Sequence, residues 1–252
     1  MNYASLKGKT AFITGGARGI GKAAARGMAQ NGARVAIADI DIAAAEATAE
    51  ELRAAGMEAI ALYCDVTDPQ SAADMAAAVM KKWGRLDIAF NNAGICINTP
   101  ALDMMHSEWN KVLDINLTGV FLTSQAAGRI MKELGGGSII NTASMSGHIV
   151  NIPQPQSTYN ASKAGVILLT KSLAVEWAPF HIRVNSISPG YIATDMTLSA
   201  PQEWQERWKD LSPTGRMGTP EELVSAVVYL ASDSASYTTG SDIVIDGAFT
   251  CI

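Results

Sequence analysis

Tyr159 and Lys163 are the residues whose types and spacing most directly suggest proton chemistry. We expect 157–163 (STYNASK) to open a long helix, on which residues four apart share one face with Cβ atoms about 5–6 Å apart. A phenol is a poor acid or base near neutrality because its ordinary pKa is about 10, but a nearby ammonium group lowers that pKa. If the pair brings this pKa to about 7, the phenolate must be stabilised by roughly 4 kcal/mol, of which Lys163 could supply much and a nicotinamide cation beside the pair could add more. Tyrosine and lysine also meet at this spacing by chance, so the pair needs support from the rest of the chain.

The first element that could position this pair lies near the N-terminus. Residues 9–14 (KTAFIT) form a short apolar run typical of a strand, and an alanine-rich helical pattern follows the loop 15–21 (GGARGIG). Glycines permit a tight turn and let a pyrophosphate approach the positive N-terminus of a helix. The spacing TGxxxGxG differs from the commoner GxGxxG dinucleotide fingerprint. The loop therefore predicts dinucleotide binding, with a merely flexible turn as the alternative.

A carboxylate at the end of the second predicted strand bears on the type of dinucleotide. Residues 33–39 (ARVAIAD) end in Asp39, 18 positions after Gly21, where an acidic side chain can accept hydrogen bonds from the adenosine ribose. Asp39 favours NAD and would repel the 2′-phosphate of NADP, although Arg18 in the glycine loop could offset that repulsion. The alternative is that Asp39 is the N-cap of the helix that starts near Asp41.

The remaining pattern predicts the scaffold. Five further strands are expected at 58–64, 86–91, 138–142, 182–188 and 241–246, and helices at 70–83, mostly within 101–134, and at 220–231. Strands that alternate with helices predict an α/β fold of the Rossmann type, a doubly wound parallel sheet of about seven strands with helices on both faces. The length of 252 residues fits one such domain, 1–252, without an internal linker.

Polar residues occur where these strands end. Asp65 follows the third strand and Ser144 the fifth, at the sheet edge where ligands of open α/β sheets gather. Ser144 lacks a GxSxG setting, so we expect a hydrogen-bond donor and not a hydrolase nucleophile. Asn116 interrupts an apolar helical pattern, so its amide is either a satisfied core group or a functional one.

Composition excludes several classes of function. Hydrophobic residues make up 48% of the chain, the net charge is −5 and no basic run occurs, which argues against nucleic acid or an anionic membrane as partner and favours a small molecule. The first nine residues lack an apolar signal-peptide core and no apolar run approaches 18 residues, so we expect a cytoplasmic protein. Three cysteines without a CxxC motif suggest neither disulfides nor a metal site.

With these motifs in order, the chain resembles the short-chain dehydrogenase/reductase family along nearly its whole length. The matching residues are Thr14–Gly21, Asp65-Val66, Asn91–Gly94, Asn116, Ser144, Tyr159 with Lys163, Pro189-Gly190 and Gly240–Gly247. The resemblance implies that Tyr159 exchanges a proton with the substrate oxygen and that Lys163 lowers the pKa of Tyr159 and holds the nicotinamide ribose. It also implies that Ser144 bonds the same oxygen and that Asn116 binds a water linking Lys163 to solvent. Homotetramers are usual in the family.

The resemblance also implies a cofactor site and no metal. Its residues would be Gly15, Arg18, Gly19, Ile20, Gly21, Asp39, Asp65, Val66, Asn91, Ala93, Gly94, Tyr159, Lys163, Pro189, Gly190, Ile192 and Thr194. Ala248 stands where the family more often has glycine, after the last strand. The expected cofactor is NAD, with NADP as the less favoured alternative. The apolar 164–177 stretch fits a helix buried on more than one side, through a subunit interface or the core of one chain.

Two segments bear on the substrate. Residues 191–218 lie between the sixth strand and the next helix, where we expect a mobile lid over the site. Within the family, 144–154 and 176–180 look like sugar-alcohol dehydrogenases and ketose or carbonyl reductases. Ser146, Asn151 and Gln154, near Ser144 and Tyr159, are candidate ligands for a polyhydroxylated substrate. The alternatives are a 3-oxoacyl-thioester or general carbonyl reductase and a non-catalytic dinucleotide sensor.

Overall fold

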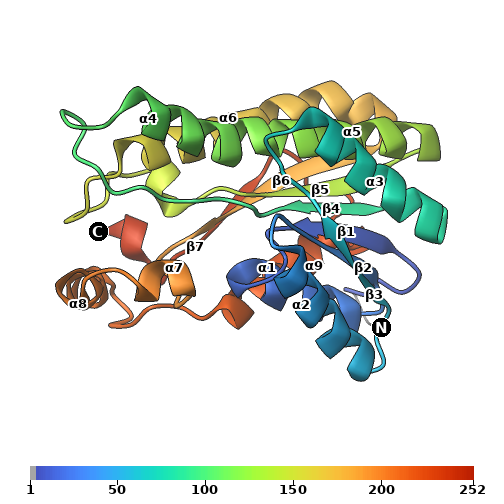
Figure 1. The fold of residues 1–252 in the computed structure, drawn as a ribbon, viewed down its shortest axis with the longest axis horizontal. Coiled ribbons are helices and arrows are strands. Elements are labelled where there is room, and N and C mark those ends of the chain that lie inside the picture. The colour runs from blue at the N-terminus through green and yellow to red at the C-terminus, as the bar shows by residue number, and fades with distance from the viewer. Residues whose placement is uncertain (1–3) are drawn as a thin grey trace.

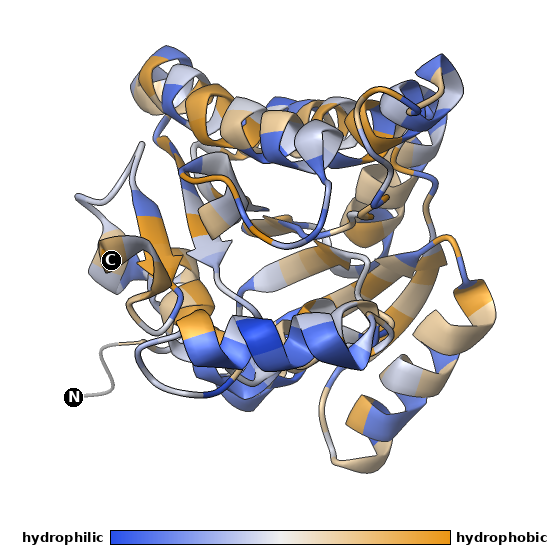
Figure 2. Ribbon diagram, turned by 90° about the vertical axis from the view of Figure 1, so that its left-hand side faces the viewer, coloured by the Kyte–Doolittle hydropathy of each residue, from blue (hydrophilic) through white to orange (hydrophobic). Residues whose placement is uncertain are grey.

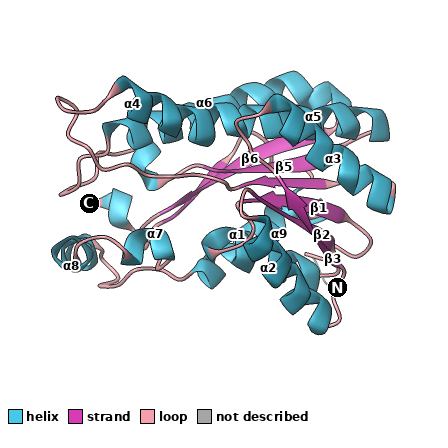
Figure 3. Cartoon of the chain, in the orientation of Figure 1, coloured by secondary structure: helices cyan, strands magenta, loops and turns pink. Residues whose placement is uncertain are grey.

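The computed structural model describes residues 4–252; residues 1–3, part of the segment in which we expect no signal peptide, lie outside it. Seven parallel strands form one sheet in the order β3-β2-β1-β4-β5-β6-β7 (Figures 1 and 3). The strands are β1 (Thr10–Thr14), β2 (Arg34–Asp39), β3 (Ala59–Tyr63), β4 (Ile88–Asn91), β5 (Gly137–Thr142), β6 (Ile182–Pro189) and β7 (Asp242–Ile245). The predicted single Rossmann-type domain with a doubly wound sheet is confirmed.

Helices cover both faces of this sheet, as Figure 1 shows. One layer holds α1 (Gly19–Gln30), α2 (Ile42–Ala54) and α9 (Val224–Ala231), and the other holds α3 (Pro69–Trp83), α5 (Gly119–Leu134) and α6 (Ser157–Trp177). Each layer buries its apolar stripe against the strands in a separate core cluster. The helices accordingly carry both apolar and polar colours in Figure 2. Because both faces of the sheet are covered, strand β1 is buried at every position.

Parallel register brings the carboxyl ends of the central strands to one edge. Thr14 of β1 pairs with Asn91 of β4, Asn91 pairs with Asn141 of β5, and Asn141 pairs with Ser186 of β6. Strand order reverses between β1 and β4, because β2 and β3 extend the sheet to one side of β1 and the later strands to the other. A crevice outside the strand ends at this reversal is where open α/β sheets bind ligands.

The observed elements agree with the predicted ones apart from their ends and two subdivisions. The 101–134 stretch contains α4 (His106–Leu113), a π-helical turn (Asp114–Thr118) and then α5. Residues 220–231 divide into a 3-10 turn (Pro220–Leu223) and α9. The 191–218 segment holds α7 (Asp195–Leu198) and α8 (Gln202–Leu211). Further 3-10 turns are Met145–Gly147, Ala178–Phe180, Asp233–Ala235 and Phe249–Cys251.

The long helix α6 is less uniformly buried than its composition suggests. Val166 and Leu173 lie in the core, whereas Leu168 and Val175 are 66% and 79% exposed. A deeply buried central helix therefore does not by itself explain the apolar sequence of α6. Separately, none of the helices within residues 4–252 combines the length and the hydrophobicity that a membrane crossing requires.

Candidate active site

A groove with a volume of about 380 Å³ lies at the carboxyl ends of β1, β4 and β5. It is lined by Gly15, Arg18, Gly19, Ile20, Asn92, Ala93, Gly94, Thr142, Tyr159, Lys163, Thr194, Asp195 and Met196. The groove thus joins the glycine loop to the Tyr159–Lys163 pair. Seven residues of the predicted cofactor site, besides that pair, line it together.

The glycine loop is shaped for close backbone approach. A Cβ atom on Gly21 would lie 2.2 Å from the Gly15 carbonyl oxygen, and one on Gly15 would lie 2.9 Å from the Cα atom of Ala93. Gly19 has a φ of +52°, a backbone conformation that favours glycine. No side chain caps the N-terminus of α1, which begins at Gly19, so its first N–H groups can meet a phosphate. These features fit the pyrophosphate of a dinucleotide.

The end of β2 carries more negative than positive charge. The Asp39 carboxylate accepts hydrogen bonds from the backbone N–H groups of Ala17, at 3.2 Å, and Asp41, at 3.1 Å. Asp41 is the actual N-cap of α2 and accepts from the Ala44 N–H group, so the alternative assignment of that cap to Asp39 is wrong. Arg18 pairs with Asp41 at 2.7 Å and is therefore not a free counter-ion beside Asp39.

Helix α6 brings Tyr159 and Lys163 together as predicted. The Lys163 Nζ atom lies 5.5 Å from the centre of the Tyr159 ring and donates a hydrogen bond to the Thr142 carbonyl oxygen at 2.7 Å. Lys163 is only 3% exposed, and this burial lowers its pKa to about 8. Burial likewise raises the pKa of the Tyr159 phenol, while a hydrogen bond from Ser144 acts in the opposite direction. Among the protein's own groups, desolvation of the phenolate therefore dominates the pKa of Tyr159.

Ser144 and Asn116 lie close to this pair. The buried Ser144 hydroxyl follows β5, accepts from the Ser146 N–H group at 3.1 Å and bonds to Tyr159. Asn116 is fully buried in the π-helical turn, and its amide exchanges hydrogen bonds of 2.8 and 2.9 Å with the backbone of Ile95. A Cβ atom on Gly94 would lie 3.3 Å from the Asn116 Oδ1 atom and 3.6 Å from the Lys163 Nζ atom, so both face one point beside the glycine.

A second cavity, of about 90 Å³, adjoins the groove at Tyr159 and Met196. It is lined by Cys96, Asn98, Ser144, Met145, Ser146, Gln154, Gln156, Tyr159, Gly190, Tyr191, Met196, Thr197, Ala200 and Trp208. Tyr159 and Ser144 thus line a partly polar cavity next to the groove. The 191–218 segment forms one side of this cavity.

An aromatic stack and buried amides form that side. The Tyr191 and Trp208 rings lie 4.3 Å apart at an interplanar angle of 10°. Gln154 joins them, since its amide accepts from the Trp208 indole N–H group at 2.9 Å and donates to the Tyr191 hydroxyl at 2.8 Å. Asn151 donates to the same hydroxyl at 3.2 Å but does not itself line the cavity. It therefore acts on the cavity only through the residues to which it bonds.

Several predicted cofactor residues lie outside the groove lining. The Asn91 amide donates to Ser124 and Asn141 inside the core, and the Asp65 carboxylate accepts from the Thr67 N–H group. Val66 is buried and packs against Gly119, where a Cβ atom would lie 2.8 Å from the Val66 side chain. Asp39 lies next to the groove, because its carboxylate accepts a hydrogen bond from Ala17 of the glycine loop. Pro189 is the last residue of β6. Gly190 and Ile192 line two other cavities. Within residues 4–252 no three His, Cys, Asp or Glu side chains form a cluster that could hold a metal.

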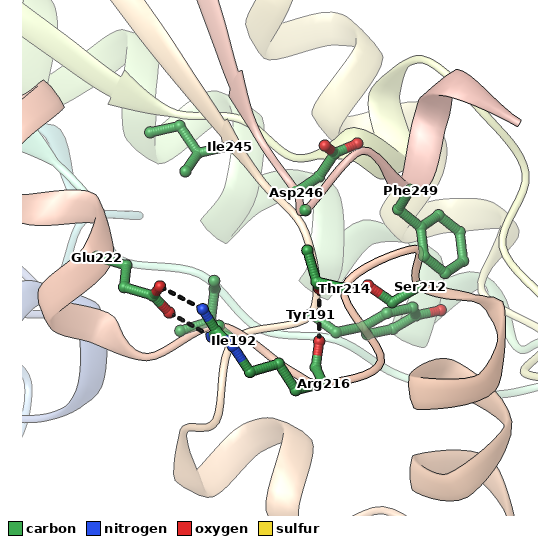
Figure 4. Close-up of a pocket in the computed structure, with 11 residues that line it drawn as sticks. Tyr191, Ile192, Ser212, Thr214, Arg216, Glu222, Ile245, Asp246 and Phe249 are labelled. Atoms are coloured by element: carbon green, nitrogen blue, oxygen red, sulfur yellow. Dashed lines mark hydrogen bonds and ion pairs between the residues drawn. The ribbon is translucent and has the colours of Figure 1, made fainter.

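Ile192 belongs to a separate cavity of about 80 Å³ at the end of β7 (Figure 4). Tyr191, Phe249 and Asp246 also line it, and the Arg216–Glu222 ion pair of 2.7 Å closes one side. Tyr191 therefore separates this cavity from the one that contains Tyr159. Tyr159 and Ser144, the residues for proton chemistry, line the other cavity and not this one.

The cavity residues that were absent from the predicted ligands include Gln156, Tyr191 and Trp208. Gln156 donates to Ser146, Asn151 and Asn160, and Tyr191 and Trp208 form the aromatic stack. Trp208 falls within residues 191–218, which the sequence predicts to be a lid, but no motif marks it as a site residue. Gln156 falls two residues after Gln154 in a segment without regular secondary structure, so no periodicity predicts where its side chain points.

The geometry can be compared with known proteins. A family model described as Enoyl-(Acyl carrier protein) reductase matches residues 15–250. The sorbose reductase of Candida albicans is 48% identical over 100% of this chain and 90% of its own length. An NADP-dependent mannitol dehydrogenase of Hypocrea jecorina is 44% identical over 99% of this chain and 95% of its own length.

Solved structures agree with the sequence comparison. The crystal structure of a short-chain type dehydrogenase/reductase from Mycobacterium marinum superimposes with a TM-score of 0.97 at 49% identity, covering 100% of this chain and 99% of the other. The match therefore extends across the sheet, the groove and the 191–218 segment. The chain belongs to the short-chain dehydrogenase/reductase family and is related to the polyol dehydrogenases, oxidoreductases that act on alcohols and ketones.

Proposed function

We propose that this protein interconverts a secondary alcohol of a sugar alcohol and the corresponding ketose with NAD(H). The observation that carries the proposal is that Tyr159 lies where the groove beside the glycine loop adjoins a cavity with polar groups in its walls. A hydroxyl placed in that cavity would be beside both the phenol and the Ser144 hydroxyl. The cofactor, when bound, supplies the hydride acceptor or donor, and the protein orients the reactants and manages one proton.

The residues divide this work among them. Tyr159 takes the proton from the substrate hydroxyl in oxidation and returns it to the carbonyl oxygen in reduction, while Ser144 holds that oxygen in place. Lys163 stabilises the phenolate and would hold the nicotinamide ribose when the cofactor is bound. Asn116 and Lys163 face the same point beside Gly94, where the missing side chain leaves room for a bridging water that passes the proton on.

The walls of the cavity support a polyhydroxylated substrate. Ser146, Gln154, Gln156 and Tyr191 bring hydroxyl and amide groups to it. A polyhydroxylated substrate can exchange hydrogen bonds with polar groups in this cavity, whereas an acyl chain offers none, and a buried polar group left unpaired costs about 1–3 kcal/mol. The names of the sorbose reductase and mannitol dehydrogenase relatives point to the same substrate class.

The charges at the end of β2 support NAD(H) over NADP(H). The Arg18 guanidinium of the glycine loop already pairs with Asp41 and not with Asp39. A 2′-phosphate would add negative charge beside Asp39, whereas ribose hydroxyls could donate to its carboxylate. The mannitol dehydrogenase relative is named NADP-dependent, so the cofactor must be measured and not transferred from relatives.

Assembly and location complete the proposal. We take residues 191–218 to be a lid that closes the cavity, because α8 presents Trp208 to it. The exposed apolar residues Leu168 and Val175 of α6 would lie in a subunit interface of a homotetramer. We take the protein to act in the cytoplasm on small molecules. Its net charge of −5 argues against nucleic acid or an anionic membrane as partner.

Two other functions would use the same fold. A 3-oxoacyl-thioester or general carbonyl reductase could use the same four catalytic residues, but a thioester on an acidic carrier protein would approach a chain that is itself negative. A non-catalytic dinucleotide sensor would need no Tyr159, Lys163 and Ser144 in contact. The polar cavity favours the polyol over both.

An activity screen tests the proposal. Polyols, ketoses, diketones and acyl thioesters are each offered with both cofactors, and we expect the highest kcat/KM for a polyol or ketose with NAD(H). Asp39→Ser should shrink the preference for NAD(H), because the carboxylate that repels the 2′-phosphate is gone. Efficient reduction of acyl thioesters with no turnover of sugar alcohols or ketoses would overturn the polyol assignment. A higher kcat/KM with NADP(H) in the wild type would overturn the assignment of the cofactor.

A further inference from the structure

The polar wall of the substrate cavity is a connected network and not a set of free ligands. Asn151, Gln154 and Gln156 are 3%, 5% and 7% exposed. Their amides bond to one another, and two of them bond to the hydroxyl of Tyr191. The indole of Trp208 joins the network from α8. Which of these groups can bond a substrate depends on the direction of each hydrogen bond.

One group fixes all the directions, because an indole N–H group can only donate. Trp208 donates at 2.9 Å to an oxygen of Gln154, so the Gln154 nitrogen faces the Gln156 oxygen at 3.1 Å and the Tyr191 hydroxyl at 2.8 Å. The Gln156 nitrogen must then face the Asn151 oxygen, at 3.1 Å. The Asn151 nitrogen consequently donates to the Tyr191 hydroxyl, at 3.2 Å.

The Tyr191 oxygen therefore accepts two N–H groups, which occupy its accepting positions. Its own proton has no acceptor in this network and is left to point elsewhere. The ring cannot turn away, because it stacks on Trp208 at 4.3 Å and meets the edge of Phe249 at 5.4 Å. Tyr191 lines two cavities, but its hydroxyl bonds to Gln154, which lines only the cavity that contains Tyr159 and Ser144, so that cavity is where a partner for the proton can be placed.

We propose that Tyr191 is a specificity-determining residue that donates its O–H group to a substrate hydroxyl other than the reacting one. This inference rests on the proposed function and extends it. Asn151 and Gln154 are positioning residues, since their N–H groups commit the phenol to donation. Because the phenol can then only donate, it selects for a hydrogen-bond acceptor at one point of the substrate. A methylene group at that point leaves the donor unpaired.

The test compares a ketose with its monodeoxy analogues, each lacking one hydroxyl group. For the wild type we expect one analogue to lose roughly 5- to 150-fold in kcat/KM relative to the parent ketose, the effect of one unpaired buried donor. Tyr191→Phe should abolish the discrimination at that hydroxyl and keep it at the others. Tyr237→Phe is the matched control, because Tyr237 is fully exposed and should leave every ratio unchanged.

A second variant separates hydrogen-bond direction from packing. In Gln154→Glu, an ionised carboxylate can accept from both Trp208 and Tyr191, so the phenol should donate to it and not to the substrate. The discrimination should then vanish at high pH and return as the pH falls through the pKa of the new carboxyl, whose protonated form donates again. The ratio of kcat/KM for the parent ketose to kcat/KM for the analogue cancels any pH dependence that both reactions share. Binding is measured separately by titrating the ketose and its analogues into the enzyme with oxidised cofactor, where no hydride can move. The ratios of the dissociation constants should match the ratios of kcat/KM.

The outcomes distinguish the two levels of the proposal. A wild type that reduces no hydroxylated ketone would overturn the proposed function and this inference with it. A wild type that discriminates among the analogues, with Tyr191→Phe discriminating equally, would overturn the role of Tyr191 alone. A pH-independent ratio in Gln154→Glu would contradict the directional network even if Tyr191 contacts the substrate.

Discussion

Burial moves the pKa values of Tyr159 and Lys163 in opposite directions. It raises that of the phenol and lowers that of the ammonium group to about 8, because both charged forms lose their hydration. The spacing of the two residues on a helix could be predicted from sequence, whereas the depth of the site could not. The proton balance of the reaction therefore depends on the surroundings of the pair as well as on the pair itself.

This gives a pH prediction for both directions of the reaction. Alcohol oxidation needs the phenolate as base. Because the pKa of the phenol is raised, the phenolate fraction still grows above neutral pH, so kcat for oxidation should keep rising from about pH 7 to pH 10. Carbonyl reduction needs the protonated phenol, so its kcat should stay flat near neutrality and fall only at alkaline pH. Steady-state rates at saturating cofactor and substrate measure both profiles. A plateau of the oxidation rate by pH 7 would show that the pKa is near neutral.

At the level of elements, the 146–156 segment and α8 are joined by Trp208. The Trp208 ring stacks on Tyr191 and its N–H group reaches Gln154, whereas the Trp204 ring lies 6.5 Å from the Trp208 ring and is only partly buried. Two tryptophans of one helix thus differ in whether they contact the cavity wall. This difference provides a matched pair of variants.

Trp208→Ala should raise KM for the ketose by roughly 10- to 30-fold, the combined effect of one aromatic stack and one hydrogen bond. The dissociation constant of the cofactor should change little, because Trp208 does not line the groove. Trp204→Ala should alter KM by less than about 3-fold, as expected when no contact worth a full hydrogen bond is lost. Equal effects of both variants would mean that α8 acts only through its general packing.

At the scale of the whole molecule, much of the fold could be predicted because local patterns determine it. All seven strands within residues 4–252 and the Gly15–Gly21 loop followed from short apolar runs and glycine spacing. The π-helical turn at Asn116 could not be predicted, since tertiary contacts with Ile95 select it over a continuous helix. The Gln154–Tyr191 bond joins residues 37 positions apart without regular periodicity, so the network became apparent only in three dimensions.

The most direct test of the account is the turnover number of Tyr159→Phe for ketose reduction with NADH. Removing one hydroxyl keeps the ring, so the melting temperature and the cofactor dissociation constant should match those of the wild type. We predict a fall in kcat of about 10²- to 10⁴-fold, as expected for loss of a general acid. Turnover within a few-fold of the wild type, in protein that melts normally, would contradict the assignment of Tyr159 as the proton donor.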